Sequence, residues 1–141
     1  AGLVAITPAS GFVGVMGAII IGLAAGIICY ACVVFKNRRR WDDALDVWGV
    51  HGMGGTAGAI LTGVLANEHI GGVAGGWEGN YMQIAINALG AGVSIAYAFG
   101  LSLLILKVMD IVWPEGIRVT PREEEIGLDI AQHGEKAYAT A

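Results

Sequence analysis

Charged side chains are scarce in this sequence of 141 residues: 14% are Asp, Glu, Lys or Arg, against 55% apolar residues. A soluble domain carries about 25% charged residues, so the composition argues against one. Disorder requires low hydrophobicity, whereas the mean hydropathy here is +0.65. The net charge of −4 argues against a nucleic-acid partner. A protein embedded in a lipid bilayer is the class that remains.

Cysteine is also scarce, with two in the chain. Cys29 and Cys32 have the spacing of a redox or zinc-binding pair. A thiolate is costly inside hydrocarbon, however, and no second cysteine pair or suitably placed histidine completes a zinc site. We therefore expect these side chains to pack as apolar groups, with no metal and no cofactor.

Asp, Glu, Lys and Arg are absent from three long stretches, residues 12–35, about 47–66 and 81–106. As α-helices these would span roughly 30 to 39 Å, enough to cross a hydrocarbon core about 30 Å thick. Residues 1–9 are also apolar and are expected to be the end of an earlier helix, which is broken at Pro8 and Gly11. The sequence predicts an all-α, polytopic membrane helix bundle: three complete transmembrane helices, the end of an earlier one, and a tail.

The positions of the basic residues predict the orientation, since Lys and Arg stay in the cytoplasm more often than outside. Four follow the first stretch, Lys107 closes the third, three lie in the tail, and residues 67–80 contain none. We expect residues 1–110 to be the membrane part and 111–141 to be a tail, with the C-terminus cytoplasmic.

Glycine is plentiful, with 23 in the chain. Small residues recur four positions apart in each stretch: Gly22 and Gly26, Gly54 and Gly58, and Gly92, Ala96 and Gly100. Helices in lipid associate through close backbone approach, so this spacing predicts a tight bundle to which further spans contribute. The plainer interpretation is that glycine is common in membrane helices.

Three aspartates precede the second stretch, where the unpaired N–H groups and the dipole of a helix favour anionic groups. We expect Asp42 or Asp43 to cap the helix. Asp46 lies one turn further in, so its burial requires a hydrogen-bond donor, and it is the aspartate expected to shape a pore mouth.

His51 is the only ionisable residue well inside any stretch apart from cysteines and tyrosines. Burying an imidazole in a membrane is costly, which favours a functional role over simple packing. In its neutral form one ring nitrogen donates a hydrogen bond and the other accepts one. At α-helical spacing His51, Gly55, Gly58 and Thr62 share one face, which we expect to border a neighbouring helix or a narrow pore. Haem ligation lacks a second axial ligand in this chain.

Residues 42–52 (DDALDVWGVHG) closely resemble the hallmark segment of the ammonium transporter family, which includes the Rh proteins. Residues 2–9 (GLVAITPA), 127–129 (GLD) and 133–138 (HGEKAY) are similar to the bacterial branch of that family. Trp48 stands where many relatives have Phe. The resemblance covers nearly the whole chain and implies the C-terminal part of a longer transporter.

This resemblance implies ammonium or ammonia transport through a narrow hydrophobic pore, without enzymatic activity, in a homotrimer of the cell (inner) membrane. His51 matches the second of two pore histidines that share a hydrogen bond, the first belonging to the missing part. Val47 matches an apolar pore-lining position. Asp46 matches an aspartate at the cytoplasmic pore exit.

The tail carries a capping-box pattern at Thr120 and Glu123, with Pro121 at the first helical position. It predicts a short helix from Pro121 to about Ile126, ended by Gly127. The family resemblance implies that such a tail packs across the cytoplasmic surface and takes part in regulation by a PII signal-transduction protein.

Two other classes of function stay open. A structural or sensory membrane module would use His51 only for packing. An intramembrane enzyme would use it as a general base, although the three stretches contain no Asp, Glu or metal-ligand cluster to work with it.

Overall fold

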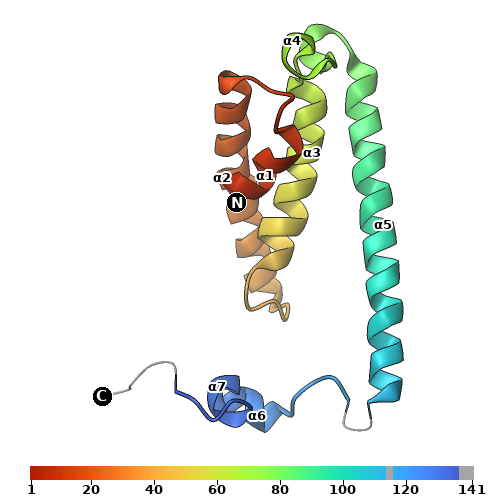
Figure 1. The fold of residues 1–141 in the computed structure, drawn as a ribbon. Coiled ribbons are helices and arrows are strands. Elements are labelled where there is room, and N and C mark those ends of the chain that lie inside the picture. The colour runs from red at the N-terminus through yellow and green to blue at the C-terminus, as the bar shows by residue number, and fades with distance from the viewer. Residues whose placement is uncertain (114–115, 137–141) are drawn as a thin grey trace. The chain divides into compact units, whose positions relative to one another are not determined.

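The computed structural model describes residues 1–113 and 116–136, and these contain helices and no strand. The predicted all-α fold is confirmed. Ala137 and Tyr138, the last two residues of the tail motif, lie outside the described residues. The elements run in the order α1 (Gly2–Ile6), 3-10 helix η1 (Thr7–Ala9), α2 (Val15–Arg39), π-helix η2 (Trp48–Met53), α3 (Gly54–Leu65), α4 (Glu68–Gly71), 3-10 helix η3 (Gly76–Glu78), α5 (Tyr81–Val112), α6 (Pro121–Ile126) and α7 (Leu128–Ala131) (Figure 1).

The chain divides into two compact units, Ala1–Ala96 and Tyr97–Ala141. The first contains the N-terminal helices, η2, α3 and the first half of α5. The predicted break after the N-terminal helix is present, because Pro8 lies in η1 and Gly11 has a φ of 81°. α2 continues past the predicted end at 35 to Arg39, and its last turn carries three basic side chains that complement the helix dipole.

The second apolar stretch is helical to Leu65 but is not α-helical throughout. It begins after Asp46, passes through the π-helix η2 and continues directly as α3. Among the described residues, two helices, Val15–Arg39 and Tyr81–Val112, are long and apolar enough by themselves to cross a membrane. The middle predicted span is therefore realised as a π-helix and an α-helix joined end to end.

Close glycine contacts join α3 to its neighbours in the first unit. A Cβ atom on Gly58 would lie 2.1 Å from the carbonyl oxygen of Ala5 in α1, and one on Gly54 would lie 2.8 Å from Sγ of Cys29 in α2. The small core beside these crossings contains Ala5, Ala9, Ile21 and Ala25, all fully buried. The tight packing predicted from glycine spacing is confirmed at this pair of positions.

α5 differs from α3 in how little it packs. Among the described residues, none in α5 is buried. It approaches α3 at Gly63, where a Cβ would lie 2.9 Å from both the carbonyl oxygen of Gln83 and Cα of Ile84. The helix runs to Val112, past the predicted end at 106, and no glycine or proline interrupts residues 101–112.

In the second unit, the predicted tail helix is confirmed as α6. The N–H of Glu123 donates to Oγ1 of Thr120, and the carboxylate of Glu123 accepts from the Thr120 N–H at 2.8 Å. Gly127 follows with a φ of 97°, which ends the helix. The side chain of Gln132 donates to Glu123 at 2.9 Å and ties the segment after α7 to α6.

Candidate functional site

The π-helix η2 is held at its start by Asp43, which is the helix-capping aspartate. Its carboxylate oxygens accept hydrogen bonds from the N–H groups of Val47 and Trp48, both at 2.9 Å. The pKa of Asp43 is lowered, chiefly by the Trp48 N–H; desolvation opposes this, and the Val47 N–H and the Lys36 ammonium add to it. The expectation that Asp42 or Asp43 caps the helix is thus met by Asp43.

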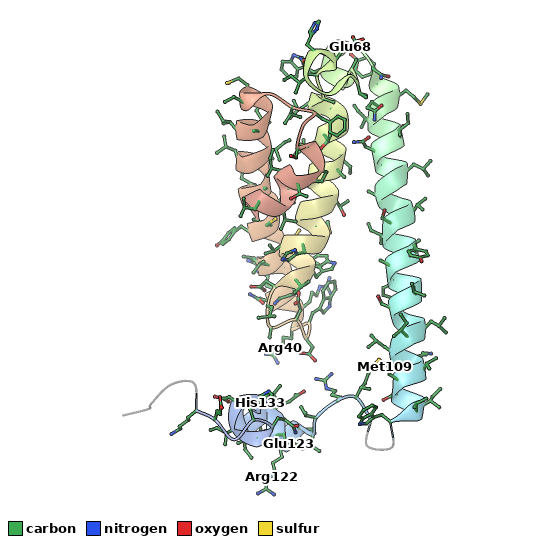
Figure 2. All side chains as sticks on the ribbon, viewed as in Figure 1. Arg40, Glu68, Met109, Arg122, Glu123 and His133 are labelled. Carbon is green, nitrogen blue, oxygen red and sulfur yellow. The ribbon has the colours of Figure 1, made fainter. Side chains whose placement is uncertain are left out.

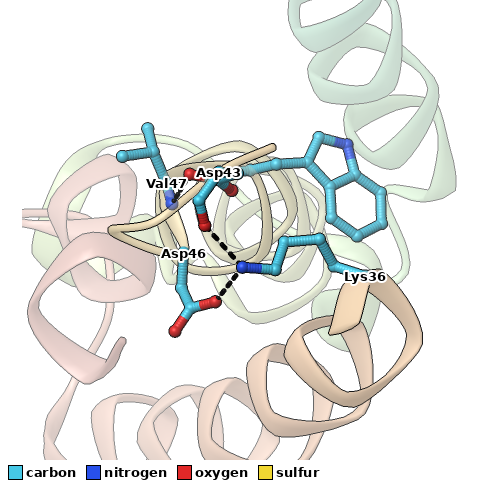
Figure 3. A network of polar contacts seen from close by, with 5 residues as sticks. Lys36, Asp43, Asp46 and Val47 are labelled. Carbon is cyan, nitrogen blue, oxygen red and sulfur yellow. Dashed lines mark hydrogen bonds and ion pairs between the residues drawn. The ribbon is translucent and has the colours of Figure 1, made fainter. Parts of the chain in front are cut away.

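Asp46 has the hydrogen-bond donor that its position requires, and that donor is Lys36. The Lys36 ammonium lies 2.5 Å from Oδ1 of Asp46 and also donates to the backbone carbonyl of Asp43 (Figure 3). Lys36 is 4% exposed, whereas the Asp46 side chain is 37% exposed. The last turn of α2 and the start of η2 are therefore joined by an ion pair that is buried on the lysine side.

Val47 follows Asp46 and is about half exposed. Behind the start of η2, the rings of Phe35, Trp41 and Trp48 form a cluster in which the Trp41 and Trp48 centroids are 5.0 Å apart. Trp48, the aromatic residue within the hallmark segment, thus anchors η2 against the end of α2.

His51 lies within η2, and π-helical turns inside helices are frequent at functional sites. Its side chain is exposed in this chain and borders an open groove of about 380 Å³ between α3 and the first half of α5. The groove is mostly apolar and carries a few polar groups. Its lining includes His51, Gly55, Thr56 and Ala59 on one side and Asn87, Gly90 and Ser94 on the other.

The face predicted from α-helical spacing is only partly correct. Gly55 lines the groove together with His51, but Gly58 is packed against Ala5 and Thr62 is buried. A π-turn holds more residues than an α-turn, so positions beyond η2 are rotated relative to a continuous α-helix. The groove consequently takes Thr56 and Ala59 in place of Gly58 and Thr62.

The structure places Asp46 and Val47 next to each other just before η2, and it places His51 within η2, beside the groove. Two further polar residues were missed from the sequence. Lys36 was used only as one of the basic residues that predict the orientation, although it is the first charged residue after a long apolar stretch. Asn87 is an amide inside the third stretch, and its side chain donates to the carbonyl of Ala59 at 2.8 Å, bridging α5 to α3.

The two ends of the helix pair α2 and α3 differ in charge. Arg40 and Glu68 lie at opposite ends of this pair (Figure 2). At the Glu68 end, the carboxylate of Glu78 accepts from the Asn67 side chain at 2.7 Å and from the Glu68 N–H at 2.9 Å, which closes the loop after α3. Lys36 and Asp46 belong to the Arg40 end.

Comparison with known proteins identifies the family. The model of the Ammonium Transporter Family matches residues 1–138, nearly the whole chain and all of the hallmark segment. The chain belongs to the ammonium transporter family. The matched residues include Asp43 and Asp46 as well as the π-helix that contains His51.

Individual relatives agree with this assignment. The ammonium transporter Amt1 of Archaeoglobus fulgidus is 45% identical over 138 residues, which cover 98% of this chain and 35% of Amt1. The ammonium transporter of Aquifex aeolicus is 48% identical over 139 residues, covering 98% of this chain and 32% of the relative. The chain thus spans about a third of the length of these relatives.

The fold is also similar to that of a solved transporter. The crystal structure of Saccharomyces cerevisiae Mep2 superposes with a TM-score of 0.80 at 34% identity, over 99% of this chain and 33% of Mep2. Relatives of this chain therefore include a yeast protein, and the likeness is not restricted to the bacterial branch that the motifs indicated.

Proposed function

We propose that the full-length protein containing this chain transports ammonium or ammonia across a membrane, and that the chain supplies one side of the pore. The observation that carries this proposal is the family match over residues 1–138, which includes His51 in a π-helix beside an open groove. The three site residues have two roles in this proposal. His51 and Val47 line the conduction path, and Asp46 stands at its cytoplasmic exit.

The physical difficulty for such a pore is the hydration of the ion. An ammonium ion loses most of its hydration on entering an apolar passage, whereas neutral ammonia loses far less. Deprotonation at the entrance, passage of ammonia and separate transfer of the proton avoid that cost. His51, with a second histidine from outside this chain, would supply hydrogen bonds and a proton path, and the apolar surroundings would exclude hydrated sodium and potassium.

Further protein or lipid has to cover this chain in its working form. Large apolar side chains point outward on α2, including Leu23 at 68% and Ile27 at 73% exposure. We propose that the earlier spans of the same subunit and a homotrimeric arrangement in the cell (inner) membrane cover these surfaces. The clustering of basic residues at the Arg40 end supports a cytoplasmic location for that end and for the C-terminus.

We also propose that two parts of the chain have different roles. Residues 1–110 would form the membrane part, and 111–141 would form a cytoplasmic regulatory tail that cooperates with a PII signal-transduction protein. The capping box that orders α6 supports a defined tail surface. Deleting residues 119–141 from the full-length protein should change transport or PII binding while the protein stays in the membrane. A deletion that alters neither would contradict the regulatory role.

Replacing His51 tests the transport function directly. In the full-length protein, His51→Ala should abolish methylammonium uptake or alter the ammonium-driven current. His69→Ala is the matched control, because His69 lies in α4 outside the spans, and it should leave both unchanged. Unaltered transport and selectivity in His51→Ala would reject the proposed role. Proteoliposomes of the wild-type protein that carry no flux would favour a structural or sensory module.

A further inference from the structure

Lys36 is buried in a way that the transport proposal does not use. It is 4% exposed, and among the described residues no other charged residue is buried. A buried charge is costly unless it is paired and hydrogen-bonded. Lys36 meets that condition with two acceptors, Oδ1 of Asp46 and the backbone carbonyl of Asp43. One ammonium group therefore holds both ends of the short segment that leads into η2.

The backbone at Asp46 shows why this contact matters for the shape of the segment. Asp46 has a φ of 55°, in the left-handed region that is unfavourable for residues other than glycine. Its carbonyl accepts the N–H of Val50 at 2.9 Å, which forms the first turn of the helix. The residue with the unfavourable backbone conformation therefore lies where the helix begins, and its carboxylate is the one that pairs with Lys36.

Asp43 completes the connection. While its carbonyl accepts from Lys36, its carboxylate caps the N–H groups of Val47 and Trp48. These two residues open the helical segment in which His51 follows. A displacement of the segment 43–46 would therefore be transmitted through the backbone of η2 to the imidazole.

We propose that Lys36 is a positioning residue for the conduction site. By binding Asp46 and Asp43 together it fixes the register in which η2 begins, and hence the place of His51. It also balances the Asp46 carboxylate, which would otherwise stand unpaired at the pore exit and retain cations. The assignment of a conduction role to His51 rests on the proposed function, but the structural role of Lys36 does not.

Lys36→Met tests this role, because it removes the ammonium and keeps an unbranched stem of similar length. In the purified full-length protein, amide hydrogen exchange at Val47, Trp48 and Val50 should become about tenfold faster, since the Asp46 carboxylate and the Asp43 carbonyl lose the donor that joins them to α2. Methylammonium uptake should fall about tenfold in maximal rate, because small misplacements of a site group are costly. Membrane level and oligomer size are measured in parallel.

Arg38→Met is the matched control. It removes one basic residue from the same last turn of α2, but Arg38 is exposed, so exchange and uptake should stay close to wild type. Lys36→Arg should restore most of both readouts, since it keeps the charge and the donors. If exchange and uptake stayed at wild-type levels in Lys36→Met but were impaired in Lys36→Arg, only the stem of Lys36 would matter. That result would overturn the proposal.

The exchange and transport readouts separate the two proposals. If Lys36→Met matches Arg38→Met in exchange, the positioning role is wrong even when His51→Ala abolishes uptake. If wild-type protein transports nothing, the transport function fails, and faster exchange at Val47 and Trp48 in Lys36→Met would still support the positioning of η2.

Discussion

α3 and α5 both contain small residues four positions apart, but they pack in opposite ways. α3 contacts α1 and α2 so closely that Gly58 and Gly54 have no room for a side chain, whereas α5 buries none of its residues within the described chain. A Cβ on Gly92 would meet no atom within 4 Å among the described residues. Glycine spacing therefore indicates that a helix can make close contacts. Whether such a contact forms depends on which helix lies next to it.

The largest loss of stability is expected from a substitution at the crossing of α1 and α3. Gly58→Ala should destabilise the full-length protein by about 3 kcal/mol, because the new Cβ would collide with backbone atoms of Ala5, which cannot move independently. The midpoint of thermal unfolding in detergent measures the loss.

Gly92→Ala is the matched control, because it makes the same substitution on α5. It should change stability by less than about 1 kcal/mol, since alanine is the better helix former and finds open space. A loss as large as that of Gly58→Ala would show that a segment outside this chain packs on α5 at Gly92. An unaffected Gly58→Ala variant would contradict the close crossing with Ala5.

A smaller effect is expected where α3 meets α2. Gly54→Ala places a Cβ near Sγ of Cys29, a side-chain atom, and should cost about 1 to 2 kcal/mol. Combining it with Cys29→Ala removes the colliding sulfur, so the double variant should lose less stability than the two single variants together. Strict additivity of the unfolding free energies would show that these two positions do not touch.

The smallest effect concerns α6, which, like α5, contains no buried residue among those described. Such a short helix depends on its cap. The pKa of Glu123 is lowered, mainly by the Thr120 N–H and next by the Thr120 hydroxyl; desolvation opposes this, and the Gln132 side chain lowers it further. Because the pKa is lowered in the folded protein, the ionised carboxylate stabilises the fold. This stabilisation is fully present at pH values above the ordinary Glu pKa of 4.5, and it is lost as the pH falls through the lowered pKa.

The protection of the α6 amides in the full-length protein, which is the intrinsic exchange rate at a given pH divided by the observed rate, should therefore fall on acidification, and Glu123→Gln should lower it already at neutral pH. Glu125→Gln, at an exposed position of the same helix, is the control and should leave the exchange rate unchanged. Equal rates in Glu123→Gln and wild type would show that the capping box does not hold the helix.

Local signals in the sequence predicted much of this structure. The break around Pro8 and Gly11, the Asp43 cap and the Thr120 capping box each depend on residues a few positions apart. The start of the helical segment, by contrast, involves a left-handed Asp46 that pairs with Lys36 ten positions earlier in the chain. The burial of Lys36 and the choice of Gly58 over Gly22 or Gly92 as a contact point depend on tertiary packing, which sequence spacing does not contain.

The candidate site shows the same division. His51 stood out because an imidazole inside an apolar run is costly and therefore calls for an explanation. The residues around His51 could not be identified in this way. The π-turn rotates Gly58 and Thr62 away from the groove, and Asn87 comes from a distant segment of the chain. The second pore histidine, which the family resemblance implies beside His51, was expected from a part of the subunit other than this chain.

In a complete subunit, His51 is proposed to border the conduction path. An experimental structure of the full-length protein would show whether it does. We predict a continuous narrow passage beside the His51 ring, with a second histidine from an earlier span within hydrogen-bond distance. A His51 ring that faces lipid, or a subunit with no passage beside the ring, would rule out the proposed conduction role of His51.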